Sequence, residues 1–158
     1  MQDPTNNPQA LDLVEEAAPY WKEWPQLKGR PYPIVTEDGM AFWLRAKKGE
    51  LAIQKCPACS KVQMPPWQTC RHCMSGNMEW VAAKGTGTVY SFSVVHHPPY
   101  EGLQAPYAFA VIELDEGVRM ATNVINCPVG DVKIGMRVRV LFKPISESIS
   151  LPFFEPDL

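Results

Sequence analysis

The chain has 158 residues, of which 46% are hydrophobic and 20% are charged, and its formal net charge is −2. This length allows one domain of ordinary size plus a small module, and the weakly acidic charge argues against a surface built to bind nucleic-acid phosphates. No apolar run approaches the roughly 18 residues of a membrane-spanning helix, and the start MQDPTNNPQA has no signal-peptide pattern, so we expect a cytoplasmic protein without a membrane anchor.

The N-terminal part, residues 1–50, is predicted to be helical. Asn7, followed by a proline, suits the start of a first helix. A second helix is expected from Glu37 to Lys47, capped by Thr36 and ended at Gly49. Both helices could simply cover the domain. The segment has more aromatic side chains than so small a unit can bury, however, which favours contact with a partner protein through Trp21, Trp24, Phe42 and Trp43.

The next segment, residues 51–82, contains four cysteines in the spacing C-x₂-C-x₁₀-C-x₂-C. Two such pairs joined by a short hairpin offer four thiolates to one tetrahedral zinc ion. A disulfide framework would need an oxidising compartment, and a thioredoxin-like site would need only one pair, so a structural zinc ion is favoured. Four thiolates fill the coordination shell, which argues against a catalytic metal. The predicted ligands are Cys56, Cys59, Cys70 and Cys73.

Short strands are expected on both sides of the cysteine pairs. Leu51 and Ile53 lead into the first pair, and Met78 to Val81 return after the second pair. This is the layout of a zinc ribbon. The fifth cysteine, Cys127, stands alone before a proline and is expected to be an ordinary reduced thiol.

The last segment, residues 83–158, shows the alternation of apolar and polar side chains that is typical of β-strands. In TGTVYSFSVV, residues 86–95, the side chains of Tyr90, Phe92 and Val94 are expected on one face. Residues 107–114 and 118–124 flank a short turn and should pair as a hairpin. Another strand, residues 136–143, places Val138, Val140 and Phe142 inward. We therefore predict a small closed antiparallel barrel of the OB-fold type.

The order of these motifs resembles a known family. The blocks CPAC, MPPW, CRHC, KGTGTVYSFSVVH, APYAFAVIELDEGVRMATNV, VKIGMRVRVLF and LPFFEP extend over roughly residues 42–156 and are similar to those of the zinc-ribbon/OB-fold proteins that accompany thiolase-type acyl-CoA enzymes. The resemblance implies a mostly β fold, with a rubredoxin-like zinc ribbon followed by an OB-fold barrel. One position departs from the pattern, because Trp67 stands where many relatives have an arginine that could pair with a phosphate.

The resemblance also implies a function. Family members are non-catalytic subunits of thiolases, or of thiolase-fold aldolases that cleave acyl-CoA side chains. It therefore implies a thiolase-fold catalytic partner, a heterotetramer with two copies of each subunit, and a CoA thioester as the ligand of the complex. The chain has no Ser–His–Asp spacing, no phosphate-binding glycine loop and no activated lone cysteine, so no residue is predicted to be catalytic.

Residues that could contact CoA or substrate lie on the barrel face and in the loop that follows residue 95. The side chains proposed for these contacts are His96, His97, Tyr100, Tyr107, Arg119, Arg137, Arg139 and Lys143. The alternative for the basic residues is that they only keep the barrel soluble.

Two other functions remain open. An OB-fold can bind single-stranded nucleic acid through a positively charged groove and stacking aromatic side chains, but the net negative charge and the dispersed basic residues argue against it here. The chain could also be a pure scaffold that bridges two acyl-CoA enzymes without touching the substrate.

Overall fold

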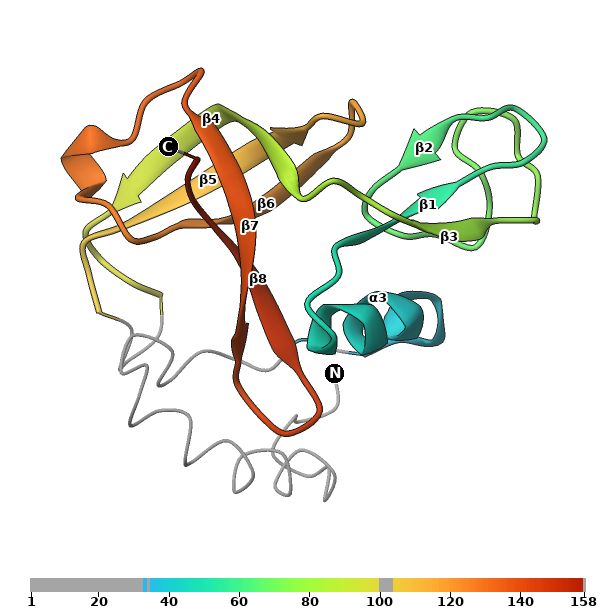
Figure 1. The fold of residues 1–158 in the computed structure, drawn as a ribbon, viewed down its shortest axis with the longest axis horizontal. Helices are drawn as coiled ribbons and strands as arrows, with labels where there is room; N and C mark the ends of the chain where they lie inside the picture. Colours follow the sequence, from blue (N-terminus) through green and yellow to red (C-terminus); the bar gives the residue numbers. More distant parts are fainter. Residues whose placement is uncertain (1–32, 34, 100–103, 158) are drawn as a thin grey trace.

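The structure, a computed structural model, describes residues 33, 35–99 and 104–157. It consists of one α-helix, α3, a three-stranded sheet and a closed five-stranded barrel that carries a short 3₁₀ helix (Figure 1). The sheet and the barrel lie side by side, and α3 packs against β1 of the sheet and against β7 and β8 of the barrel. None of the helices in the described part of the chain is long and apolar enough to cross a membrane. The first predicted helix, which would start near Asn7, lies outside the described residues.

Helix α3 spans Glu37–Lys47, as the sequence predicted. The side chain of Thr36 accepts a hydrogen bond from the backbone N–H of Gly39, at 3.3 Å, and so satisfies a donor that the first turn leaves free. The helix ends before Gly49, whose φ of 77° suits a residue without a side chain. Phe42 and Ala46 are buried and attach the helix to the core.

The zinc ribbon is a small antiparallel sheet in the order β2-β1-β3. Its strands are β1 (Ala52–Lys55), β2 (Val62–Gln63) and β3 (Glu79–Ala82). Leu51 and Ile53 are almost fully buried and belong to the same hydrophobic cluster as Phe42 and the barrel interior. The ribbon, the helix and the barrel therefore share one core.

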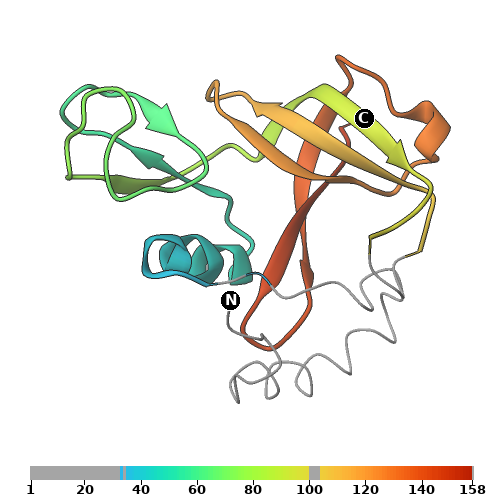
Figure 2. The ribbon, with the colours of Figure 1, turned by 180° about the vertical axis from the view of Figure 1, so that it is seen from behind.

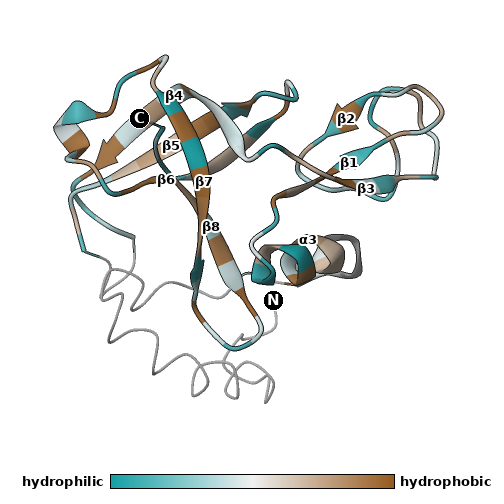
Figure 3. Ribbon diagram, in the orientation of Figure 1, coloured by the Kyte–Doolittle hydropathy of each residue, from teal (hydrophilic) through white to brown (hydrophobic). Residues whose placement is uncertain are grey.

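The barrel confirms the predicted OB-like architecture, with strand order β4-β5-β6-β8-β7. Its elements are β4 (Thr86–Val95), β5 (Tyr107–Leu114), β6 (Arg119–Val124), the short 3₁₀ helix η3 (Val129–Asp131), β7 (Arg137–Pro144) and β8 (Ser150–Pro156). Hydrophobic and hydrophilic residues alternate along β7 (Figure 3), and Val138, Val140 and Phe142 face the core as predicted.

Tyr90 does not lie on the face predicted for it. The pairing of β4 with β5 shifts between Val89 and Ser91, which makes Tyr90 the extra residue of a β-bulge. Val89 is fully buried and Phe92 packs against the core, whereas Tyr90 is 48% exposed. The bulge thus moves the Tyr90 ring to the outer surface.

The barrel closes between β6 and β8 through a short pairing only. These strands are parallel and pair only at Val124 and Phe154, next to a 2.8 Å hydrogen bond from Ile125 N–H to the Phe154 carbonyl. Pro152 in β8 has no N–H to donate, and its carbonyl accepts instead from the Thr122 hydroxyl at 2.8 Å. The two strands therefore separate, and the hairpin between β5 and β6 extends toward the ribbon (Figures 1 and 2).

Gly87 provides a test of the tight packing at the start of the barrel. A Cβ atom at this position would lie 2.5 Å from the Glu113 carbonyl oxygen and 2.9 Å from a methyl group of Ile112. We expect Gly87→Ala to lower the free energy of unfolding by about 1–3 kcal/mol, because neighbouring backbone must move. Urea denaturation of the full chain measures this change.

The matched control is Gly130→Ala, since a Cβ atom at Gly130 meets no described atom within 4 Å. Its unfolding free energy should stay within about 0.5 kcal/mol of that of the parent chain. Equal effects of the two substitutions would show that the close approach at Gly87 is not a constraint.

Candidate metal centre and adjoining groove

The two cysteine pairs are held by turns of the same construction. In the first turn, the Cys56 N–H donates to the Lys61 carbonyl and the Ser60 N–H donates to the Cys56 carbonyl, both at 2.8 Å. In the second turn, the Cys70 N–H donates to the Ser75 carbonyl at 2.8 Å and the Met74 N–H donates to the Cys70 carbonyl at 2.9 Å. Ser60 and Met74 both have positive φ, 61° and 62°. Each turn thus presents two thiols on one side.

The four predicted ligands come together. Their sulfur atoms all lie within 4.8 Å of one another, and the Cys56–Cys73 and Cys59–Cys70 Sγ pairs are each 3.6 Å apart. A tetrahedral ion with Zn–S bonds of about 2.3 Å would separate its sulfurs by about 3.8 Å. The geometry therefore fits a zinc ion bound by Cys56, Cys59, Cys70 and Cys73, with no position left open for substrate.

The thiols influence one another's ionisation. Burial alone would raise the pKa of Cys70, but backbone N–H groups of His72 and Cys73 and the nearby thiols outweigh it and lower this pKa to about 6. For Cys59, a backbone hydrogen bond with Lys61 favours the thiolate, but burial and the other three cysteines raise its pKa to about 12. Because the Cys59 thiol keeps its proton near neutral pH when no cation is bound, a cation is needed to hold all four sulfurs as thiolates.

Two buried glutamines connect the metal centre to the loop that carries Trp67. The Gln63 amide donates to Gln54 Oε1 at 2.9 Å, and the same oxygen accepts from the Trp67 N–H at 2.8 Å. Gln63 Oε1 accepts from the N–H of Arg71, which lies between the last two ligands, at 3.0 Å. Gln54 and Gln63 are only 5% and 4% exposed, so these bonds are made in a largely dry environment. The second cysteine pair and the Trp67 loop are therefore fixed together.

A groove of about 640 Å³ lies where α3, the ribbon and the barrel meet. The helix contributes Phe42 and Trp43, and the ribbon contributes the loop from Met64 to Trp67. The barrel contributes Phe109 of β5, residues 119–123 of β6 and residues 151–153 of β8. The opening between β6 and β8 thus forms part of the groove wall, and most of the lining is apolar.

The residues proposed to contact CoA do not gather at one site. His96 and His97 are exposed at the end of β4, Tyr107 is half-buried at the start of β5, and Tyr100 lies outside the described residues. Lys143 is half-buried on β7. Of the described members of this set, only Arg119 lines the groove.

Three of the proposed basic contacts are held by carboxylates. The Arg119 guanidinium lies 2.7 Å from Glu113 and 3.4 Å from the centre of the Tyr90 ring. Arg139 lies 2.9 Å from Glu155. The third, Arg137, makes two hydrogen bonds to Asp115, at 2.7 and 3.0 Å. These partners largely neutralise the positive charge that CoA phosphates would require.

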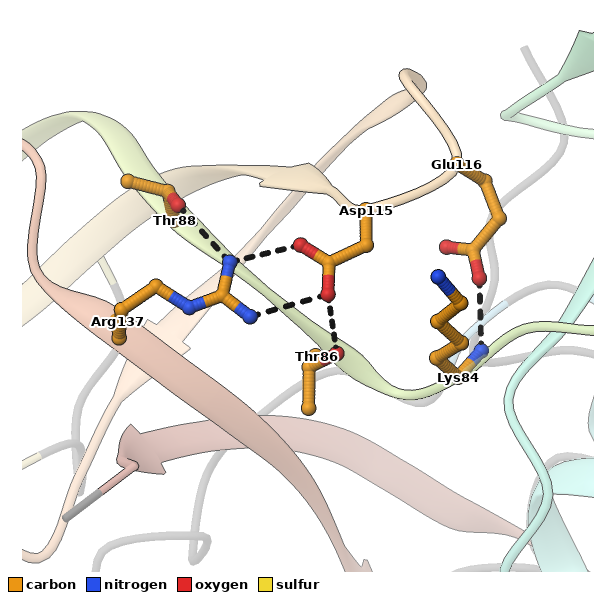
Figure 4. Close-up of polar contacts among 6 residues, drawn as sticks. All are labelled: Lys84, Thr86, Thr88, Asp115, Glu116 and Arg137. Atoms are coloured by element: carbon orange, nitrogen blue, oxygen red, sulfur yellow. Dashed lines mark hydrogen bonds and ion pairs between the residues drawn. The ribbon is translucent and has the colours of Figure 1, made fainter.

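Asp115 lies at the centre of a polar network (Figure 4). Besides Arg137, it accepts from the Thr86 hydroxyl at 2.5 Å, and the neighbouring Glu116 accepts from the Lys84 N–H at 2.8 Å. Lys84 belongs to the segment between the ribbon and the barrel. The network therefore fastens the β5–β6 hairpin to β4, to β7 and to the end of the ribbon.

Two of the four expected partner contacts are described. Phe42 and Trp43 make an edge-on aromatic contact, with ring centres 5.0 Å apart, and both line the groove. Phe42 is only 6% exposed, so it offers little surface to a partner. Trp21 and Trp24 lie outside the described residues. An interface through these four side chains stays a prediction.

Sequence reasoning missed the groove and the buried glutamines. A proline within the alternating segment SLPFFEP was the available signal for an interrupted strand pair. Trp67 was noted only as a departure from the family pattern, although it is 57% exposed at the edge of the groove. No local pattern indicated that Gln54 and Gln63 face each other.

Comparison with known proteins identifies both modules. Residues 43–79 match the rubredoxin-like zinc ribbon domain of ChsH2, and residues 80–143 match the C-terminal OB-fold domain of ChsH2. Among solved structures, a chain of the Ltp2-ChsH2(DUF35) aldolase has a TM-score of 0.75 and 37% identity, covering 80% of this chain and 100% of its own length.

Curated relatives carry several names. A probable enoyl-CoA hydratase alpha subunit of Thermomonospora curvata is 41% identical over 80% of this chain, which spans only 40% of that relative's length. A DUF35 domain-containing scaffold protein of Methanothermobacter thermautotrophicus is 33% identical, over 72% of this chain and 87% of its own length. Benzoylsuccinyl-CoA thiolase subunit BbsA of Thauera aromatica is 28% identical over 58% of each chain.

The Asp115 network should make stability depend on pH. Hydrogen bonds from Arg137 and from Thr86 hold the pKa of Asp115 well below its usual range of about 3.9. A carboxylate whose pKa is depressed by folding stabilises the fold above its unfolded-state pKa, and this contribution is lost as the pH falls through the folded-state pKa. We therefore expect Asp115→Asn to lower the urea midpoint at pH 7 and to lower it less at pH 3.

The control for Asp115→Asn is Glu147→Gln, which removes an exposed carboxylate that has no ion pair among the described residues. Its midpoint should match that of the parent chain at both pH values. A constant loss for Asp115→Asn across this range would mean that the ion pair is not the source of the effect.

The metal centre is tested by Cys73→Ser. We expect this variant to lose zinc and to unfold the ribbon, because so small a sheet depends on the ion for much of its folding free energy. The measurements are metal content by mass spectrometry, with about one zinc per parent chain expected, and the near-ultraviolet signal of the tryptophans.

Cys127→Ser is the matched control for the metal. Burial raises the pKa of the Cys127 thiol, and this residue packs at the edge of the core rather than with the four clustered cysteines. The Cys127→Ser variant should therefore retain zinc. A folded Cys73→Ser chain with no metal and an unchanged ribbon would contradict the structural role of the ion.

Proposed function

We propose that this chain, which belongs to the DUF35 family of zinc-ribbon and OB-fold proteins, is a non-catalytic subunit of a complex that acts on acyl-CoA thioesters. The proposed partner is a thiolase-type catalytic subunit, a thiolase or an aldolase. The observation that carries the proposal is the combination of a saturated four-thiolate centre with a large apolar groove formed by all three parts of the chain.

The described part of the chain lacks the groups that thiolase chemistry needs. That chemistry requires an activated cysteine nucleophile and a base beside it. Four of the described cysteines surround the metal position, and burial raises the pKa of the fifth, Cys127, which disfavours its thiolate. The catalytic groups must therefore come from a partner subunit.

The names of the relatives support an acyl-CoA role. Two curated relatives are named as subunits of CoA-thioester enzymes, a hydratase and a thiolase, and the matched solved structure is an aldolase. These activities belong to those proteins. For this chain they support association with an enzyme that acts on a CoA thioester. We propose that this complex lies in the cytoplasm, where thiol ligands stay reduced.

In the proposed complex, a zinc ion stabilises the ribbon and the rigid chain shapes the channel along which an acyl-CoA lies. Holding the substrate in a productive orientation accelerates a reaction without touching the reacting carbon. We propose a heterotetramer with two copies of each subunit, as is common for symmetric assemblies of dimeric enzymes. The modules of this subunit are residues 1–50, 51–82 and 83–158.

Contacts with CoA are proposed at the barrel end that carries His96, His97 and Tyr107, with Tyr100 in the adjoining loop. The arginines at 119, 137 and 139 would meet a phosphate only by exchanging a carboxylate partner for it, since each already has one. Lys143 completes the proposed set.

A pure scaffold is the second candidate, favoured by the name of the Methanothermobacter relative. The two functions differ in their effect on turnover. A subunit that shapes the substrate channel changes the KM or kcat of its partner, whereas a scaffold changes only which enzymes are held together. Nucleic-acid binding is disfavoured, because the arginines on the barrel surface are paired with acids.

Affinity purification of the tagged full chain from its own organism tests the proposal. We expect a thiolase-fold subunit in about equal amount, identified by mass spectrometry. Adding this chain to the isolated partner should change the kinetics of acyl-CoA turnover. The Cys73→Ser variant serves as the control, since a chain with an unfolded ribbon should recover less partner.

Other results of the purification would contradict the proposal. Recovery of nucleic acid, with binding that weakens steeply as salt increases, would favour a nucleic-acid-binding module. Recovery of two enzymes whose kinetics do not change on addition of this chain would favour the scaffold.

A further inference from the structure

The strand edge of β6 that faces the groove has unpaired backbone groups. The Leu114 N–H donates to the Val118 carbonyl at 2.8 Å, which sets the alternation of the β5–β6 ladder. In this register Met120 and Thr122 bond to β5, so the N–H and C=O groups of Arg119 and Ala121 point away from β5. No described residue forms a backbone hydrogen bond with Arg119 or Ala121 on that side, because β8 joins β6 only at Val124.

The side chains around this edge are apolar and partly exposed. Phe42 and Trp43 lie on the helix side of the groove, while Trp67, 57% exposed, and Phe109, 45% exposed, stand at its ribbon and barrel sides. Met40 and Leu44, 49% and 56% exposed, extend this surface along α3, since Met40 lies three residues before the groove-lining Trp43 and four before Leu44, the spacings of neighbours on a helix. Such a concentration of exposed apolar side chains is typical of a contact surface.

The groove has almost no uncompensated charge. Among the described residues that line it, Arg119 is the one ionisable residue, and its guanidinium is engaged by Glu113 and by the Tyr90 ring. An occupant that carries several negative charges would find no free cation among the described lining residues. An uncharged occupant would find apolar walls and two backbone donor and acceptor pairs in a row.

We propose that an extended, uncharged and mainly apolar segment of the catalytic partner subunit lies in this groove and adds to the β6 edge as a short strand. The proposal rests on the proposed function, in which such a partner exists. Strand addition satisfies the N–H and C=O groups of Arg119 and Ala121, while alternate side chains of the segment enter the space between Trp43 and Phe109. The pantetheine arm of CoA also carries amides that could bond to this edge. The phosphorylated nucleotide of CoA, however, does not suit the neutral groove.

The groove is formed before the partner arrives. Trp67 is held by the hydrogen bond from its N–H to the buried Gln54, and the β5–β6 hairpin is held by the Asp115 network. A preformed site costs little conformational entropy on binding.

Residue-resolved hydrogen exchange tests the proposal. We compare the free full chain with the purified complex that contains its catalytic partner. In the complex, the amides of Arg119 and Ala121 should exchange at least about tenfold more slowly, because strand addition gives each a hydrogen-bond acceptor. Side-chain packing alone would leave these two N–H groups without an acceptor.

A pair of variants tests the same edge by affinity. Ala121→Pro removes only the N–H that faces the groove, since Ala121 lies opposite Val111 in a pair that is not hydrogen-bonded. We expect its affinity for the partner to fall at least about tenfold, as hot-spot truncations do. Ala121→Ser retains the N–H and should bind normally. If the proline variant does not fold, Trp67→Ala takes its place as the test variant. Its control is Ile134→Ala, because Ile134 is 70% exposed and does not line the groove.

Each alternative has its own signature. A complex that forms while both amides exchange as in the free chain would overturn this proposal and leave the proposed function standing. Protection in the free chain, either as a monomer or as a dimer, would assign the groove to this chain itself. Protection by octanoyl-CoA added to the free chain would assign it to the substrate. Failure to recover any partner would overturn this proposal and the proposed function together.

Discussion

A proline without a backbone N–H limits how far the barrel can close. Pro152 lies in β8, the strand that must pair with β7 on one side and with β6 on the other. Toward β7 the neighbours of Pro152 complete a regular ladder, whereas toward β6 Pro152 has no N–H to donate and its carbonyl accepts a single bond from the Thr122 hydroxyl. The strands separate on the N-terminal side of Val124, and the opening becomes one wall of the groove.

The position of α3 follows from the same opening. An exposed seam between two strands would leave core side chains in contact with water, and the helix covers it with Phe42 and Trp43. Phe42 joins the main core, whereas Trp43 packs against both this core and the small cluster of Ile145, Ile149 and Phe153 at the far end of β7 and β8. Burial of these rings holds the helix in place through the hydrophobic effect. The helix covers the seam only in part, and the uncovered part is the groove.

Much of the fold follows from local patterns, and the groove does not. Thr36 and Gly49 fix the ends of α3 because capping and a positive φ act within one turn. The spacing of the cysteines identifies the ligands, since each pair sits in a turn of its own. Tyr90 was assigned to the wrong face because one bulged residue reverses a two-residue alternation. The pairing of Arg137 with Asp115, and the opening at Pro152, depend on strands distant in sequence that no local pattern brings together.

The metal centre and the groove are physically coupled. Arg71 lies between two ligands, and its N–H bonds to Gln63, whose amide bonds to Gln54, whose oxygen holds the N–H of Trp67. Every step of this chain is a hydrogen bond made by a side chain that is nearly excluded from water, so a break at one end leaves an unpaired polar group that costs about 1–3 kcal/mol. Loss of zinc would free the second cysteine pair, withdraw the partner of Gln63 and release the Trp67 edge of the groove. A zinc ion that binds no substrate can thus set the affinity of this chain for whatever occupies the groove, since the shape of that surface depends on the ion.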